Sequence, residues 1–170
     1  TIDLAPTLLE FFGVEIPKDM LGKPLRGVME TDSPVREYGI FGSHSGVLSV
    51  TDGKYVLMVA PKDKEGGLYN YTLMTTHMRS RMSVEELQQA SLAGPFSFTK
   101  GCRVLKIPAI CKKMSDLPVG GELVFDVAED PKQEHPLEDN GISARLKEAM
   151  IRILEENDAP AELYDYYGLK

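Results

Sequence analysis

The segment 3–13 constrains the fold more than any other part of the chain, because most of its residues are apolar. It predicts a short helix: Asp3 is placed to cap free backbone amides, Pro6 is tolerated in the first turn, and Gly13 is placed to end it. The apolar side chains form two neighbouring rows: Leu4, Leu8 and Phe11, and Ala5, Leu9 and Phe12. A short helix that is apolar over most of its circumference is normally buried between layers. We therefore expect this chain to hold only some of those layers; the alternative, a surface helix, would expose a large apolar patch.

The overall composition describes an ordinary globular protein. The chain has 170 residues, of which 42% are hydrophobic and 26% are charged, with a net charge of -7. A negative net charge argues against broad attraction to nucleic acid or anionic lipid, so we expect no nucleic-acid partner. No apolar run approaches the roughly 18 residues of a membrane span, so we also expect no membrane partner. Any bound anion must be held by a local cluster of positive groups.

The cysteines give little information about the fold or the function. Cys102 and Cys111 are the only cysteines. They are too few for a disulfide framework and lack the companions of a zinc site, and they are compatible with a reducing compartment.

Short β-type runs dominate the middle of the chain. We expect strands at about 38–42, 47–51, 55–59, 68–73 and 122–127. Asp52-Gly53 between two of these runs is a strong hairpin signal. The stretch 93–119 is rich in glycine, proline and serine and gives no clear element.

Helical signals surround these strands. A short helical turn is expected near 25–29, and Ser83 with Glu86 forms a capping box that predicts a helix over 84–90. Apolar residues at helical spacing between Ile142 and Leu154, with charged residues opposite, predict an amphipathic helix. The expected fold class is α+β: a small antiparallel sheet covered by a C-terminal amphipathic helix, preceded by a helix that belongs to a missing larger α/β domain.

The order of these elements resembles a known family. Residues 2–10, followed by Gly13 and by residues 22–25, resemble a segment of the sulfatases of the alkaline phosphatase superfamily, where the catalytic domain gives way to a smaller C-terminal domain. Residues 51–57 are similar to a strand of that small domain. Each motif alone is weak, but their order and spacing together are fairly specific.

A later pattern extends the resemblance. Residues 122–126 and 129–134 are similar to the family's Leu-Tyr-Asp-Leu and Asp-Pro-x-Glu pattern, although Val124-Phe125 departs from it. The resemblance implies three regions: 1–34 as the end of the catalytic domain with its connection, 35–158 as a C-terminal α+β subdomain with an insertion at about 68–119, and 159–170 as a tail.

The resemblance also implies chemistry that lies outside this chain. The family uses a formylglycine made within Cys/Ser-x-Pro-x-Arg, together with a calcium-type divalent cation, and neither Cys102 nor Cys111 begins that motif. Asp139-Asn140-Gly141 superficially resembles the family's metal motif but stands where a helix cap belongs. We therefore expect no catalytic residue, no metal ligand and no cofactor here. The expected partners are the missing N-terminal catalytic domain and, in the intact protein, a small anionic ester substrate.

Cationic side chains could still reach that substrate, because arginine, lysine and histidine donate charge-assisted hydrogen bonds to sulfate or phosphate oxygens. His44 lies in the glycine- and serine-rich loop 42–46, which we expect to be flexible. His77, Arg79 and Arg81 precede the helix at 84–90, and Lys100 is a weaker candidate. The alternatives are an ordinary turn around His44 and simple pairing of the other cations with surface carboxylates.

The sequence leaves two rival functions open. The first is the same region of a phosphodiesterase or phosphonate monoester hydrolase, which shares the C-terminal layout. The second is a non-catalytic binding module.

Overall fold

The chain divides into two compact units. A computed structural model describes residues 1–62, 67–109 and 117–170, so Cys111 lies outside the described residues. The first unit joins Thr1–Glu37 to Gly94–Arg103, and the second joins Tyr38–Ala93 to Val104–Lys170.

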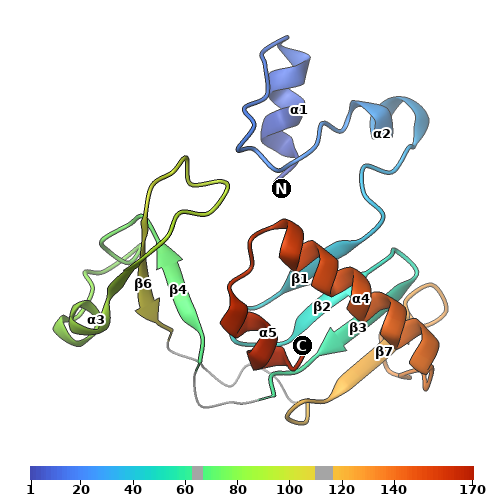
Figure 1. Cartoon of the computed structure of the whole chain (residues 1–170). Coiled ribbons are helices and arrows are strands. Elements are labelled where there is room, and N and C mark those ends of the chain that lie inside the picture. The colour runs from blue at the N-terminus through green and yellow to red at the C-terminus, as the bar shows by residue number, and fades with distance from the viewer. Residues whose placement is uncertain (63–66, 110–116) are drawn as a thin grey trace. The chain divides into compact units, whose positions relative to one another are not determined.

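The second unit is built on a four-stranded antiparallel sheet (Figure 1). Its order is β1-β2-β3-β7, with bounds β1 Gly39–Gly42, β2 Leu48–Thr51, β3 Tyr55–Val59 and β7 Glu122–Asp126. All four strands agree closely with the prediction. The predicted hairpin at Asp52-Gly53 joins β2 to β3, and Gly53 has a φ of +93°, which glycine adopts without strain.

Helix α4 (Asn140–Glu156) packs against this sheet and contacts β2 and β3 (Figure 1). Val50, Leu57 and Val124 stand opposite one another across three strands, so they share one face of the sheet. With Leu146 and Met150 of α4 they form a buried hydrophobic core. The inward-facing residues of the strands, which recur every second position, and those of the helix, which recur every three or four positions, therefore pack in one apolar layer. The predicted α+β class is confirmed.

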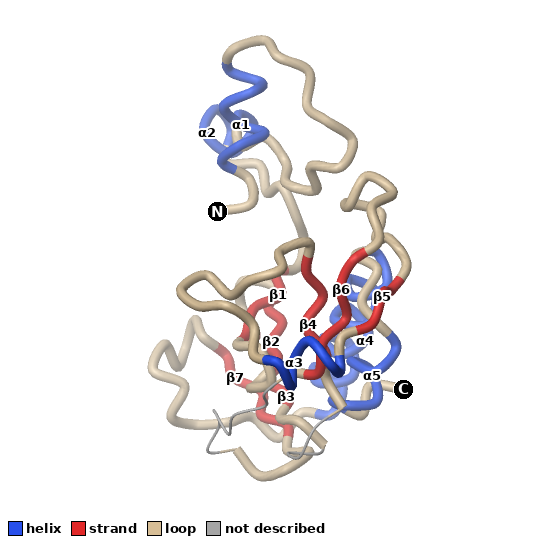
Figure 2. The backbone as a smooth tube through the Cα atoms, turned by 90° about the vertical axis from the view of Figure 1, so that its left-hand side faces the viewer, coloured by secondary structure: helices blue, strands red, loops and turns tan. Residues whose placement is uncertain are grey.

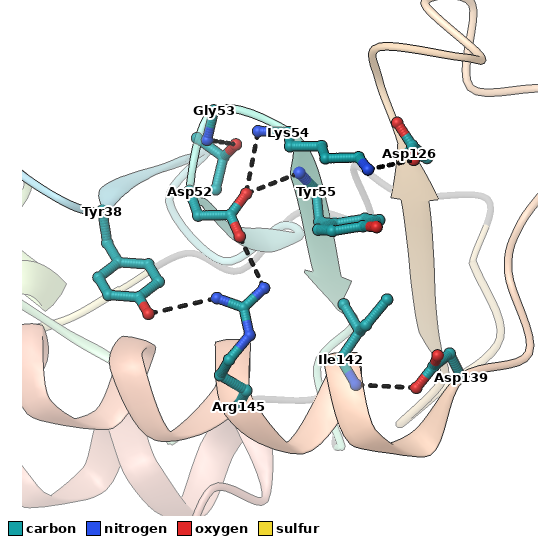
Figure 3. A network of polar contacts seen from close by, with 10 residues as sticks. Tyr38, Asp52, Gly53, Lys54, Tyr55, Asp126, Asp139, Ile142 and Arg145 are labelled. Carbon is teal, nitrogen blue, oxygen red and sulfur yellow. Dashed lines mark hydrogen bonds and ion pairs between the residues drawn. The ribbon is translucent and has the colours of Figure 1, made fainter.

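A polar network fixes the hairpin to the helix (Figure 3). Asp52 accepts hydrogen bonds from the backbone N–H groups of Lys54 and Tyr55, at 2.9 and 2.7 Å. Its other carboxylate oxygen accepts one from Arg145 of α4, at 2.6 Å. The same guanidinium reaches the hydroxyl of Tyr38 at 3.3 Å. One aspartate thus shapes the turn and also ties it to α4.

The end of the chain forms another helix, α5 (Ala161–Tyr167), within the region expected as a tail. Tyr164, Tyr166, Tyr167 and Leu169 are buried and belong to the same core as α4 and the sheet. Gly168 ends the helix with a left-handed φ of 64°.

A second, three-stranded antiparallel sheet lies in the region expected as an insertion (Figure 2). Its order is β4-β6-β5, with bounds β4 Tyr69–Thr72, β6 Val104–Pro108 and β5 Ser91–Ala93. Helix α3 (Val84–Gln89) packs on β6 and begins with the predicted capping box of Ser83 and Glu86. Strand β6 comes from the stretch 93–119 that gave no clear prediction, and β5 lies largely just before that stretch, where no strand was expected.

The first unit holds helices α1 (Leu4–Phe11) and α2 (Arg26–Thr31). Gly13 follows α1 with a φ of +67°, in agreement with its predicted role. The predicted capping by Asp3 is wrong: its side chain makes no cap hydrogen bond. Its carboxylate instead accepts two hydrogen bonds from Arg36, both at 2.6 Å, and one from the backbone N–H of Lys23 at 2.8 Å. A guanidinium satisfies both carboxylate oxygens at once, which a helix terminus does not.

Two stretches that carry the family resemblance lie against each other in this unit. Thr7 accepts a hydrogen bond from the backbone N–H of Leu25 at 3.0 Å. Gly22 is buried against the Ile2 backbone, and a Cβ at Gly22 would stand 2.1 Å from the Ile2 carbonyl oxygen. Segments 2–10 and 22–25 therefore form one local structure in which aspartate, threonine and glycine each have a physical role.

The Asp3–Arg36 pair predicts a measurable pH dependence. The hydrogen bonds from Arg36 and from the Lys23 amide lower the pKa of Asp3 to about 2. A depressed carboxyl pKa stabilises the folded state above the unfolded value, and this contribution is lost as the pH falls from about 4 towards 2. The shift corresponds to about 1–2 kcal/mol, once discounted because the Arg36 side chain is 38% exposed. Titrating the Asp3 carboxyl carbon by NMR checks the pKa. Asp3→Asn should remove the pH dependence of local protection at the Lys23 amide, and a midpoint near 4 would contradict the assignment.

Within the described residues, no helix combines the length and the apolar character needed to cross a membrane.

Candidate functional site

The loop 42–46 presents His44 to solvent on a fixed backbone. The His44 side chain is exposed, whereas the next two residues, Ser45 and Gly46, are buried. Ser45 adopts a left-handed φ of 59°, which turns the chain back into β2. The histidine therefore sits at the outer edge of a tight turn.

Two tyrosine side chains of α5 form hydrogen bonds to the backbone of this turn. The hydroxyl of Tyr166 donates to the carbonyl of Ser45 at 3.1 Å, and that of Tyr167 donates to the carbonyl of Gly46 at 2.8 Å. Both hydrogen bonds are buried. In the second half of the loop, two buried carbonyls therefore accept hydrogen bonds from side chains in a distant part of the sequence.

Removing these hydroxyls should destabilise the second unit. Tyr167→Phe leaves the buried carbonyl of Gly46 without its donor, so we expect a loss of about 1–3 kcal/mol in the free energy of unfolding, measured in urea. Tyr164→Phe is the matched control, because the Tyr164 hydroxyl makes no hydrogen bond within the described parts of the chain. Equal effects of the two changes would show that the hydroxyl of Tyr167 does not anchor the turn.

His44 borders a pocket of about 400 Å³. Its wall is mainly apolar and comes from β1, β2, α4 and α5, with Leu48, Leu154 and Leu163 among the lining side chains. Ser43, His44 and Ser45 supply polar groups. None of the lining residues carries a carboxylate.

The second predicted cluster lies before α3. His77 Nε2 is 2.8 Å from Glu86 Oε1, and Glu86 also accepts a hydrogen bond from the backbone N–H of Ser83. The amide of Ser83 and the nearby His77 hold the pKa of Glu86 below its ordinary value. His77 is thus engaged by a helix-capping carboxylate, which agrees with the simple pairing considered from the sequence.

Arg79 and Arg81 differ from His77. Both are exposed, and neither guanidinium forms an ion pair with the residues that the structure describes. Arg81 and His77 line a pocket of about 510 Å³, together with Glu85 and Glu86. The structure thus brings these two predicted residues to one pocket, but two carboxylates share it.

Lys100 belongs to the first unit, whereas the other four candidates belong to the second. Its ammonium group lies 3.2 Å from a carboxylate oxygen of Asp19. This pairing gives Lys100 a local structural role.

Asp139 caps α4 (Figure 3). One of its carboxylate oxygens accepts hydrogen bonds from the backbone N–H groups of Gly141 and Ile142, at 2.8 and 2.9 Å. The predicted cap is confirmed, and this oxygen is already used by the helix. Across residues 1–62, 67–109 and 117–170, no group of three or more histidine, cysteine, aspartate or glutamate side chains is arranged to hold a metal ion.

Sequence reasoning missed the role of Tyr166 and Tyr167. The aromatic character of the last residues indicated docking on some surface, but nothing in the local pattern named the loop 42–46 as their partner. The contact spans a sequence separation of 121 residues.

Comparisons with known proteins add little to this geometry. No protein-family model matches the chain, and no curated protein matches it either. Among solved structures, the chain is similar to BT4656 in complex with its substrate D-glucosamine-2-N,6-O-disulfate, at 16% sequence identity and a TM-score of 0.44. The match covers 91% of this chain and 22% of BT4656.

Proposed function

We propose that this chain is the C-terminal part of a sulfatase-type ester hydrolase, that it performs no chemistry by itself, and that α1 packs against the catalytic domain. The observation that carries the proposal is the exposed apolar surface of α1. Phe11 and Phe12 are each 73% exposed, and the other exposed apolar side chains in and beside the helix are Ile2, Leu4, Leu8 and Val14. Exposed apolar patches of this kind mark interaction surfaces.

The local structure around α1 supports the family part of the proposal. Asp3, Thr7 and Gly22 belong to the motifs that resemble the sulfatases, and each makes a specific contact within the first unit. These contacts hold α1 against the connection that follows it, while its apolar side chains remain exposed. Such an arrangement suits a helix that ends a larger domain. In this proposal the nucleophile and the divalent cation belong to that larger domain.

The exposed basic side chains of the second unit support a role beside the substrate. A sulfate ester carries negative charge, and His44, Arg79 and Arg81 are exposed groups able to donate hydrogen bonds to it. Arginine is the best suited of these because its planar guanidinium matches two sulfate oxygens. His77 and Lys100 contribute less in this proposal, since each already faces a carboxylate.

Steady-state kinetics on the intact hydrolase test the proposal. We expect Arg79→Ala or His44→Ala to lower kcat/KM for a sulfate monoester by about 10- to 100-fold, the equivalent of one hydrogen bond to a charged group. His135→Ala is the matched control, because His135 is an exposed histidine in a loop after β7. Unchanged kcat/KM in both variants would restrict these residues to structural roles.

The choice of substrate separates the rival functions. Sulfate monoesters, phosphodiesters and phosphonate monoesters should be assayed in parallel on the intact protein. A strong preference for either phosphorus ester would replace the sulfatase assignment, and metal-dependent turnover by this chain alone would overturn the proposal that it is inactive.

A further inference from the structure

We propose that the pocket beside His44 binds the apolar body of an anionic ligand, whose charged head lies at His44 and Ser43. The ligand class is an aryl or branched-alkyl ester of sulfate. This choice of head group depends on the proposed function, whereas binding in the pocket can be measured without any catalysis.

The shape and lining of the pocket favour an apolar body. Its volume of about 400 Å³ falls within the range of small-molecule sites. The wall combines side chains from four elements and one loop: Ile40, Leu48, Leu68, Leu154 and Leu163. Burying one aromatic ring against such a wall removes apolar surface on both sides from water, which is favourable.

The charges around the pocket select an anionic head. Among the residues that the structure describes, no aspartate or glutamate lines this pocket. Its polar lining residues include His44 and two serines. The pocket beside His77 differs, because the carboxylates of Glu85 and Glu86 share it with Arg81 and would offset the attraction of that guanidinium for an anion. The polar groups of the first pocket therefore suit an anionic head without a competing carboxylate among the described lining residues.

The polar edge is held in place before any ligand arrives. Tyr166 and Tyr167 fix the carbonyls of Ser45 and Gly46. A Cβ at Gly46 would stand 2.1 Å from the Ser43 hydroxyl oxygen, so this hydroxyl packs directly over the glycine. A rigid edge lowers the entropy cost of binding, since the loop does not have to be ordered by the ligand.

Binding of 2-naphthalenesulfonate to the full 170-residue chain tests the inference. This compound combines an aromatic body with a sulfonate head and cannot be hydrolysed like an ester. NMR titration should shift amide signals of the loop 42–46 and of Leu154 and Leu163. His44→Gln should weaken binding about 5- to 10-fold by removing one charge-assisted hydrogen bond, and His135→Gln should leave it unchanged. Leu163→Trp, which fills the pocket, should abolish binding.

Two further ligands separate the contributions of body and head. Naphthalene-2-sulfonamide keeps the body without the charge, so it should bind the native chain and His44→Gln equally. Methanesulfonate keeps the head without the body and should show no binding below millimolar concentration. The inference is overturned if 2-naphthalenesulfonate shifts only signals of α1, or if His44→Gln binds it as tightly as the native chain.

The result can be told apart from a failure of the proposed function. Binding at this pocket together with absence of sulfatase activity in the intact protein would remove the proposed function and leave the site. Sulfatase activity without binding at this pocket would remove only the present inference.

Discussion

Replacing both Phe11 and Phe12 by aspartate is expected to destabilise the intact protein by more than about 3 kcal/mol, because in the proposed packing of α1 against a catalytic domain the change places two charges in a buried interface. In this chain by itself the same change should alter the free energy of unfolding by less than about 0.5 kcal/mol, since both rings are 73% exposed. Urea unfolding of the intact protein and of the chain measures the two values. The double variant should also reduce any self-association of the chain, which analytical ultracentrifugation detects.

The control for this comparison is Met78→Asp. Met78 is 93% exposed in the second unit and has no proposed role in the interface. We expect it to leave the stability of both the chain and the intact protein unchanged within about 0.5 kcal/mol. If the Phe11/Phe12 double variant also leaves the intact protein unchanged, α1 is a surface helix and the proposed packing is wrong.

The second large effect is expected at the centre of the core. Leu146 of α4 is fully buried against the sheet, so Leu146→Ala should cost about 3–5 kcal/mol through lost burial and the remaining cavity. The midpoint of urea unfolding of the second unit measures this loss. Leu87→Ala in α3 is the matched control, because Leu87 is half exposed, and it should change stability by less than about 0.5 kcal/mol. A similar cost for both substitutions would contradict the placement of α4 on the sheet.

The elements that sequence reasoning predicted well are those with local signals. Short β-type runs predicted β2 and β3, Asp52-Gly53 predicted the turn between them, and the spacing from Ile142 to Leu154 predicted α4. Each signal is decided by residues close in sequence. Strands β5 and β6 were missed because neither alternates clearly, and both are defined by pairing with each other across a sequence that resembles a loop.

Side-chain partners were harder to predict. Asp3 was expected to cap a helix because it stands just before one. Instead its carboxylate accepts two charge-assisted hydrogen bonds from Arg36, 33 residues away. Asp139 kept its predicted capping role because no cation competes for it among the described contacts.

In the candidate site too, contacts between residues distant in sequence were the part that could not be predicted. Composition and spacing identified exposed cations, and the structure adds which of them face carboxylates: His77 lies beside Glu86, and Lys100 lies beside Asp19. The apolar pocket beside His44 could not be predicted, because four separate elements, the loop 42–46 and Leu68 build it. Its rigid edge depends on tyrosines more than 100 residues away in sequence.

The sequence of the gene upstream of the Thr1 codon tests the central claim most directly. We predict an open reading frame that continues upstream and encodes Cys/Ser-x-Pro-x-Arg, followed by acidic residues for a divalent cation. A start codon adjacent to Thr1, or an upstream domain without this motif, would contradict the assignment of the chain to a sulfatase-type hydrolase.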